Sequence, residues 1–450
     1  MLSVPQRDTI PFQETVAWLH GVRLAGEPAV AAKARLLLLD TIACAVVGMA
    51  EPELKALTAE LAATSPGRAQ WPAADALSPG SATFVASMAA CWHEACEGLA
   101  RAHGRPGLHA IPVAVSLGLA RGATLGAVLE AIVHGYEIGG RAGQAMRIRS
   151  GLHVDGTWGV FAAVAAAARL MNLTPEKTLH ALAIAACQMP TSLYAPIAAG
   201  RTARNTYVGH AGLLALHVTA AARAGVTAPE DAFVQAAHVL GGTPPATSWP
   251  WAKAGEFLIL QSYLKPFAAV RHVHYAAACA LQRFAARGGD TAAIAALELH
   301  TYQEAMTYCG NRAASTAIQA QFSLTHGTAF AIRHGTLGPE AYAASVFTDP
   351  EHARLERLIT LHVDPAIAHR GARLVVKTKD GHETYETATV PGDPENPLST
   401  EAATAKALAY MTPVIGTSRA NAIVAHVLHA APEAAFAFPE AAVSARTVRG

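Results

Sequence analysis

Small apolar residues at helical spacing are the feature that most limits what this chain can fold into. From about residue 12 to residue 284, Ala and Leu recur at i, i+3 and i+4 steps, and Pro and Gly separate the segments. Helices are expected over residues 33–49, after the Asp155-Gly156 turn and over residues 209–224. One face of the first segment carries small or apolar side chains, namely Ala34, Leu37, Leu38, Thr41, Ala45 and Gly48. Such faces allow close contact between helices, so the pattern predicts a large helical domain.

The composition restricts both the fold and the partners. Of the 450 residues, 52% are hydrophobic and 15% are charged, and the formal net charge is +1. This length suggests two or three domains, and the low charge content favours a compact helical protein with an extensive oligomer interface. Because Lys and Arg form no cluster, binding to nucleic acid or to an anionic membrane is not expected.

The sequence also indicates a compartment. Residues 1–19 lack the apolar core of a signal peptide, and no run of eighteen apolar residues occurs. The six cysteines contain no C-x-x-C pair and form no regular framework. A reduced, cytoplasmic protein is therefore expected.

The pattern changes after about residue 265. Residues 295–302, 358–363 and 372–378 alternate apolar and polar side chains as half-buried strands do. Asp380-Gly381 is a hairpin signal before a further strand at 383–390. A helix is expected between the strands, over residues 313–335.

These patterns divide the chain into two domains. The predicted fold is mainly α, with an all-helical domain formed by residues 1–265 and 399–450. A smaller α+β domain is predicted for residues 266–398. Residues 392–397 form a Pro-rich connector, after which Ser399-Thr400-Glu401 opens a helical tail that can return to the first domain.

One short segment gathers charged side chains between two Ala-rich helices. Between residues 93 and 112 lie Glu94, Glu97, Arg101, His103, Arg105 and His109. Burying such groups is costly unless they bind or react with something, although a solvated loop is an alternative. We therefore treat this segment as part of a candidate active site.

Further motifs follow this segment along the chain, and each is weak alone. The set comprises Leu38–Cys44, Glu94–Gly98, Ala102–Gly107, Gly135–Glu137, His153 with Gly156–Gly159, Arg204–His210, Lys265–Phe267 with His274, Gln321–Ser323 and Gly392–Ser399. In this order they resemble the MmgE/PrpD family of dehydratases, decarboxylases and epimerases. The resemblance implies that the α+β domain is an inserted lid, that the site lies in the cleft and that the protein is a homodimer. It also implies chemistry on a small di- or tricarboxylate without a metal or organic cofactor.

The resemblance also implies roles for single residues. Glu94 stands where the family has its first Asp, and Glu97 belongs to the same segment. His153 matches the family's histidine, and Lys265 matches its lid-side lysine. His326 falls where several members have a tyrosine.

Two departures from the family pattern change the expected chemistry. Arg105 replaces the histidine of Gly-His-Pro, and Arg204 replaces a lysine. An arginine rarely transfers protons, so both residues are expected to hold carboxylates. His103 or His109 is then left to replace the missing histidine.

We therefore predict a cofactor-independent lyase that removes a proton beside a carboxylate and then eliminates or decarboxylates. The predicted catalytic residues are Glu94, His103, His109, His153, Lys265 and His326, and the predicted substrate-binding residues are Arg105, Arg204 and Glu97. No metal ligand is predicted, because Cys91, His93, Cys96 and His103 match no standard zinc spacing.

Other interpretations remain open. An isomerase or epimerase would use the same proton abstraction, and a diverged member would only bind its ligand. Structural roles also compete with the catalytic ones: His153 as a helix cap, Lys265 as a hinge residue, and His326 as a core histidine. Arg204 could be an ion-pair partner of Glu137 or of another buried acid.

Overall fold

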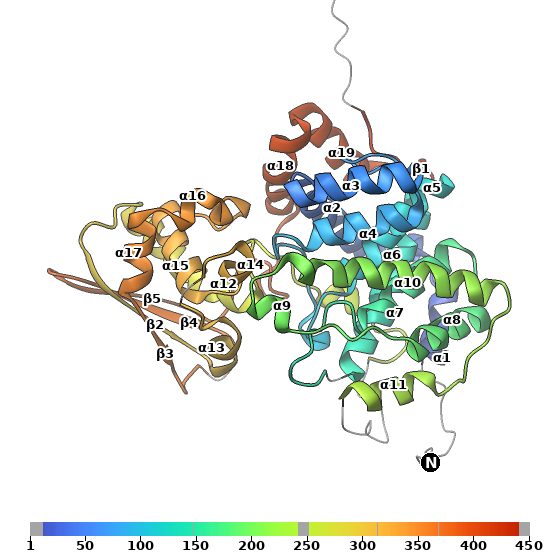
Figure 1. Cartoon of the computed structure of the whole chain (residues 1–450), viewed down its shortest axis with the longest axis horizontal. Coiled ribbons are helices and arrows are strands. Elements are labelled where there is room, and N and C mark those ends of the chain that lie inside the picture. The colour runs from blue at the N-terminus through green and yellow to red at the C-terminus, as the bar shows by residue number, and fades with distance from the viewer. Residues whose placement is uncertain (1–11, 147, 242–251, 313, 368, 441–450) are drawn as a thin grey trace, which may run out of the picture.

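The computed structural model describes residues 12–146, 148–241, 252–312, 314–367 and 369–440. In this part of the chain a large group of helices stands beside a smaller group that contains a four-stranded sheet (Figure 1). The prediction of a mainly α fold is confirmed. The predicted domain boundaries at residues 265/266 and 398/399 remain predictions.

Among the described residues before 242, the helical part contains eleven α-helices. Their bounds are α1 Gln13–Gly21, α2 Pro28–Met49, α3 Pro52–Thr64, α4 Pro79–Cys91, α5 Pro106–Arg121, α6 Leu125–Ala145, α7 Gly159–Leu170, α8 Pro175–Cys187, α9 Ala195–Ala198, α10 Thr206–Arg223 and α11 Ala232–Gly241. A short strand, β1 Pro66–Ala69, lies between α3 and α4. Several of these helices begin with a proline. Proline suits this position because the N–H groups of the first helical turn have no partner within the helix, so the N–H that proline lacks is not missed.

Helix α7 lies at the centre of the helical part and packs against α5, α6 and α10. All its residues except Arg169 are buried, as expected of a helix that is apolar on every side. Small side chains set the distance between these helices. A Cβ atom added to Gly139 of α6 would lie 2.5 Å from the Cβ of Ala162.

The helical tail consists of α18 Thr400–Ile415 and α19 Thr417–His429, and both helices pack against α2. A buried ion pair joins the tail to α2, with 2.6 Å between Lys406 Nζ and Asp40 Oδ1. The same ammonium group donates to the carbonyl oxygen of Ala95 at 2.7 Å. The tail therefore helps to hold the charged segment around residue 94.

The sheet part begins with α12 Arg271–Arg287. It continues with β2 Ile294–Thr301, α13 Gln303–Cys309, α14 Ala317–Gln321, α15 Leu324–His334, α16 Ala344–Phe347, α17 Pro350–Leu358, β3 Ile359–Val363, β4 Ala372–Thr378 and β5 Gly381–Thr387. The strand order is β3-β2-β4-β5; β2 and β3 run parallel, and the other two pairs are antiparallel. Along β2, Leu297, Leu299 and Thr301 are buried on one face.

The four predicted strands are present, with small shifts at their ends. The hairpin signal at Asp380-Gly381 joins β4 to β5, and Gly381 has a φ of 140°. The single helix expected over residues 313–335 is wrong, because the chain forms α14 and α15 with a break at Phe322 and Ser323. Ser323 Oγ accepts the N–H of His326 at 3.2 Å and so caps α15. Residue 313 lies outside the described residues.

The chain crosses between the helical part and the sheet part twice, near Leu264 and near Gly392, and the two crossings lie side by side. The N–H of Leu264 donates to the carbonyl oxygen of Gly392 at 3.1 Å. Gly392 has a φ of 97°, and a Cβ atom there would lie 1.9 Å from the oxygen of Leu264. Close to this point, Arg271 forms an ion pair with Asp393. The crossing is therefore closely packed next to Lys265.

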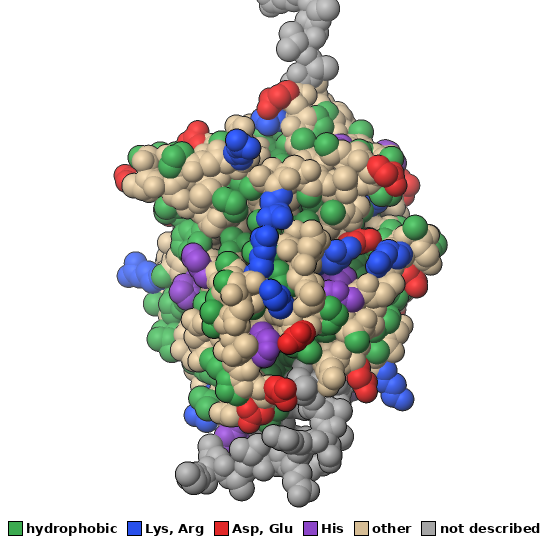
Figure 2. Space-filling model, turned by 90° about the vertical axis from the view of Figure 1, so that its right-hand side faces the viewer, with side chains coloured by type: hydrophobic (Ala, Val, Ile, Leu, Met, Phe, Trp, Pro, Cys, Tyr) green, Lys and Arg blue, Asp and Glu red, His purple; other side chains and the backbone are tan. Residues whose placement is uncertain are grey.

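Two surface properties bear on the expected partners. Among the described residues, none of the helices is long and apolar enough to cross a membrane. Figure 2 shows acidic and basic side chains scattered among hydrophobic ones over one face of the molecule.

We expect the Gly48→Ala variant to be less stable than the wild type. The added Cβ would lie 2.1 Å from the carbonyl oxygen of Ala89 in α4, so α2 and α4 must move apart. Overpacking of this kind costs about 1–3 kcal/mol. Urea denaturation measures the loss, and Gly21→Ala, which adds a Cβ with nothing within 4 Å, is the control. Equal losses in the two variants would contradict the interpretation.

Candidate active site

A cavity of about 150 Å³ lies between the helical part and the sheet part. Residues from both parts line it, namely Glu94, Leu99, Ala100, His103, Gly104, Arg105, His153, Val154, Asp155, Arg204, Tyr263, Lys265, Val270, Arg271, His272, Glu304, Phe322 and Arg370. Six of the nine residues predicted to form the site are among them. Among these described lining residues, five Lys and Arg side chains face three carboxylates, so basic groups outnumber acidic ones.

Glu94 stands on a loop that other segments hold in place. Its backbone is left-handed, with a φ of 54°, which is uncommon for a residue with a side chain. Lys265 Nζ donates to the carbonyl oxygen of Glu94 at 2.7 Å, and Gln321 Nε2 donates to that of Trp92 at 2.9 Å. The backbone of Gly98 pairs with that of Tyr263. Contacts from distant parts of the chain therefore position this carboxylate.

Three buried cations surround the Glu94 carboxylate. Lys265 Nζ lies 3.0 Å from its Oε2, and Arg204 Nη2 lies 2.5 Å from its Oε1. Arg105 spans both oxygens, with Nη1 3.1 Å from Oε2 and Nη2 3.0 Å from Oε1. All four side chains are at most 6% exposed, so these charges interact in a medium of low polarity.

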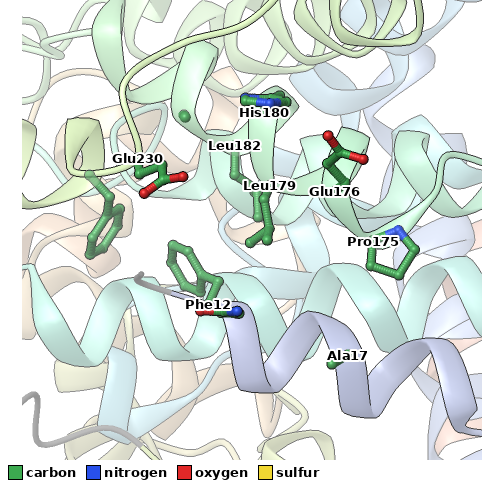
Figure 3. A pocket seen from close by; sticks show the side chains of 11 residues that line it. Phe12, Ala17, Pro175, Glu176, Leu179, His180, Leu182 and Glu230 are labelled. Carbon is green, nitrogen blue, oxygen red and sulfur yellow. The ribbon is translucent and has the colours of Figure 1, made fainter. Parts of the chain in front are cut away.

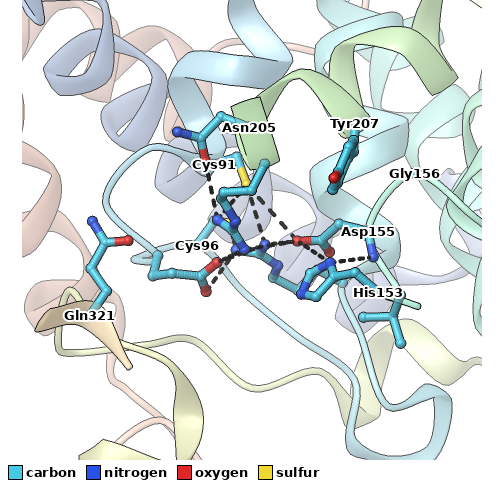
Figure 4. Close-up of polar contacts among 12 residues, drawn as sticks. Cys91, Cys96, His153, Asp155, Gly156, Asn205, Tyr207 and Gln321 are labelled. Carbon is cyan, nitrogen blue, oxygen red and sulfur yellow. Dashed lines mark hydrogen bonds and ion pairs between the residues drawn. The ribbon is translucent and has the colours of Figure 1, made fainter. Parts of the chain in front are cut away.

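Asp155 is the second carboxylate of this group. Its Oδ2 accepts from Arg105 and, at 3.3 Å, from Arg204 Nη2 (Figure 4). We call Glu94, Asp155, Arg105, Arg204 and Lys265 the ion cluster. With three cations and two anions it carries an excess positive charge beside the cavity.

The cations set the protonation state of both carboxylates. Burial favours the neutral acid, but Arg105, Lys265 and Arg204 outweigh it and hold the pKa of Glu94 well below its usual range. Burial also raises the pKa of Asp155, but nearby positive charges, of which Arg105 has the largest effect, outweigh it and lower that pKa. Both groups are therefore ionised at neutral pH and are weak bases.

His153 joins the ion cluster from the segment before α7. Its Nδ1 accepts the N–H of Asp155 at 3.1 Å, so the proton of the neutral ring lies on Nε2. Burial lowers the pKa of His153 to about 4, although the charge of Asp155 opposes it. The ring is thus a neutral hydrogen-bond donor at pH 7.

A cysteine also contacts the ion cluster. Cys91 Sγ accepts from Arg204 Nη1 at 3.2 Å and from Arg105 Nη2 at 3.3 Å. Cys91, Glu94 and Asp155 together have the spacing of a metal site. Two guanidinium groups and an ammonium already occupy these ligand atoms and would repel a divalent cation, so this group does not suit a metal.

Four of the predicted residues stand apart from the ion cluster. His103 is exposed and lines the cavity, and it has a left-handed backbone with a φ of 52°. His109 lies behind Arg105, where Nδ1 contacts the Arg105 carbonyl oxygen at 3.0 Å and Nε2 accepts the N–H of Gly156 at 3.0 Å. Both of its ring nitrogens are therefore engaged by the backbone.

Glu97 and His326 also lie outside the cavity lining. Glu97 is buried and accepts from Leu108 N and from Tyr136 Oη, each at 3.0 Å. Burial raises the pKa of Glu97 to about 7. His326 lies on α15, where burial lowers its pKa to about 4. The roles predicted for Glu97, His109 and His326 gain no support from this geometry and stay predictions.

Sequence reasoning missed several residues of the site. Asp155 is the most important, and its position two residues after His153 could have identified it. Arg271, His272, Glu304 and Arg370 from the sheet part also line the cavity, and no motif pointed to them. The expected pairing of Arg204 with a buried acid is present, but the acids are Glu94 and Asp155. Glu137 instead pairs with Arg141 at 2.6 Å.

A second cavity, of about 360 Å³, lies among α1, α8 and the start of α11 (Figure 3). Its walls are mostly apolar, with Phe12, Leu179 and Leu182, and its acidic residues are Glu176 and Glu230. No Lys or Arg is among the described residues that line it. These described walls therefore offer less to a carboxylate ligand than those of the first cavity.

Comparison with protein families finds two models that match the chain. The MmgE/PrpD N-terminal domain matches residues 13–241, and the MmgE/PrpD C-terminal domain matches residues 267–430. The first model covers helices of the helical part, and the second covers the sheet part and the tail. A comparison with curated proteins finds no match for the sequence.

We expect His153 to make the protein less stable as the pH falls from about 6.5 toward 4. In this window the unfolded chain binds a proton on the imidazole and the folded protein does not, so the free energy of unfolding decreases. Between pH 7 and pH 5 the contribution is about 2 kcal/mol. His153→Gln should lose that much less stability than the wild type in urea denaturation at the two pH values.

The control for this experiment is His382→Gln, because His382 is exposed on β5. Its stability should change with pH as that of the wild type does. A His153→Gln variant with the same pH dependence as the wild type would contradict the assignment of a neutral, buried ring.

Proposed function

Because the chain belongs to the MmgE/PrpD family, we propose that it is a lyase acting on a small di- or tricarboxylate. The family is one of dehydratase- and decarboxylase-type enzymes. The observation that carries the proposal is the ion cluster, in which three buried cations outnumber two buried carboxylates at the wall of the cavity. An anionic ligand is the natural partner for that excess charge.

In this proposal, Arg105, Arg204 and Lys265 hold a carboxylate of the substrate. Removing a proton from the carbon beside a carboxylate builds a second negative charge on it, and fixed cations stabilise that charge. The guanidinium groups are already oriented by Glu94 and Asp155, so they need little reorganisation. Nε of Arg204 is buried without a hydrogen-bond partner among the described residues.

The proton acceptor in the proposed reaction is an imidazole. Glu94 and Asp155 are poor bases, because the cations hold them ionised. Neutral His153 has its proton on Nε2 and is assigned as a hydrogen-bond donor to the developing charge or to a departing hydroxyl group. His103, which also lines the cavity, is assigned as the base. Glu94 then orients the cations.

The direct test is proton NMR of the chelator-treated protein in D2O with malate, tartrate, citrate and cis-aconitate. We expect loss of a substrate signal together with a new olefinic resonance, because elimination beside a carboxylate forms a C=C bond. Deuterium incorporation without a new product would instead show an isomerase or epimerase. No change with any acid, together with calorimetric binding of one of them, would show a protein that only binds its ligand.

We expect Arg105→Gln to lower kcat/KM by about 30-fold or more. Without this guanidinium the ion cluster loses its excess positive charge, and removing one partner of a buried charge pair costs about 2–5 kcal/mol. Steady-state kinetics with the acid found by NMR measures the loss.

The matched control is Arg101→Gln, because Arg101 is an exposed arginine in the same segment and pairs with Glu256 at the surface. Its kcat/KM should stay close to that of the wild type. Equal activity of the two variants, with both folded by circular dichroism, would contradict the assigned role of Arg105.

A further inference from the structure

A second group of charged and metal-binding side chains lies in the sheet part, where α15 and α17 run side by side (Figure 1). His326 comes from α15, and His352 and Glu356 lie one turn apart on α17. The imidazole of His326 and that of His352 are both buried, and the Glu356 side chain is 17% exposed. Neither the ion cluster nor the proposed reaction uses these three residues.

The three side chains have the spacing of metal ligands. His326 Nδ1 lies 3.0 Å from His352 Nε2, and His352 Nε2 lies 3.6 Å from Glu356 Oε2. One ligand atom of each residue lies within 4.8 Å of the other two. Ligands bound at about 2.1 Å from one ion lie roughly 3.0–3.4 Å apart at octahedral or tetrahedral angles. Small side-chain movements would therefore close the group around an ion.

Hydrogen bonds to the outer atoms of His326 and Glu356 fix the orientation of the nitrogen and the oxygen that could bind an ion. His326 Nε2 donates to the carbonyl oxygen of Ala341 at 2.9 Å, which leaves the lone pair of Nδ1 inside the group. Thr325 Oγ1 donates to Glu356 Oε1 at 3.2 Å, which leaves Oε2 beside His352. Imidazole and carboxylate ligands of metal ions commonly have such outer partners.

We propose that His326, His352 and Glu356 bind a divalent transition-metal ion, with zinc as the representative, at a structural site separate from the reacting cavity. Two imidazoles and one carboxylate suit first-row ions rather than calcium or magnesium. Among the described residues no Lys or Arg lies within 4 Å of this carboxylate, whereas three cations contact Glu94 in the ion cluster. A cation that acts on Glu356 is Arg312, which interacts with it without forming an ion pair.

Binding changes the tautomer of one ring. Without an ion, His352 Nε2 donates its proton to His326 Nδ1. With an ion, both of these nitrogens coordinate, and the proton of His352 moves to Nδ1, which has no hydrogen-bond partner among the described residues. The ion would join α15 to α17, and the start of α15 follows Phe322 in the cavity wall. The site thereby stiffens one side of the proposed active site.

The test is titration of the chelator-treated protein with Zn²⁺ by calorimetry and with Co²⁺ by visible spectroscopy. We expect about one ion per chain, and a higher unfolding temperature when zinc is present. Glu356→Gln and His352→Gln should each weaken binding by about tenfold or more. The matched control is His334→Gln, because His334 is an exposed histidine at the end of α15. Circular dichroism establishes that each variant is folded.

X-ray absorption of the zinc-loaded wild type identifies the ligands without any variant. A first shell of two imidazoles completed by oxygen supports the proposal. A shell containing sulfur would place the ion at a cysteine and overturn it. Failure of the wild type to bind, or Glu356→Gln binding as tightly as His334→Gln, would also overturn it.

Discussion

The ion cluster is the interaction on which the rest of the structure depends. Taking five charged groups out of water is costly, and the cost is offset only when each group has close partners of opposite charge. Glu94, Asp155 and Arg204 come from separate segments of the helical part, and Lys265 lies where the chain leaves it. The helices and the sheet part must therefore hold four segments in fixed relative positions. Displacement of any one of these segments would leave a buried charge without its partner.

Other buried polar contacts help to fix these positions. Asp40 and Lys406 connect α2 with the tail and reach the carbonyl oxygen of Ala95, next to Glu94. Glu137 and Arg141 on α6 bind the backbone of residues 252–259, which precede Lys265. These pairs lie outside the cavity lining, so their effect on the site is positional. Close packing of the helices also fixes these segments, because glycine and alanine faces allow the backbones to approach without large side chains between them.

Much of the fold could be predicted from the sequence because local patterns determine it. The strands around Leu297 and Leu374 follow from alternation, and the hairpin at Gly381 follows from its turn residues. The helix over residues 313–335 was mispredicted because its apolar periodicity continues across the break, whereas Ser323 forms a cap there. For the site, six of the nine predicted residues line the cavity, but sequence patterns do not distinguish a cavity residue such as His103 from a packed one such as His109.

The sequence by itself determined the helical architecture, the sheet and the family, because periodicity, turn residues and motif order are properties of neighbouring positions. Only the tertiary structure decided which charges meet. Asp155 and Glu94 share cations in the ion cluster, and Glu97 accepts a hydrogen bond from Tyr136. His326 contacts His352, which is 26 residues later in the chain and lies on another helix. The physical reason is that the protonation state and partners of a buried charge depend on groups within a few ångströms in space. Those groups are brought together by packing, which spacing along the chain does not encode.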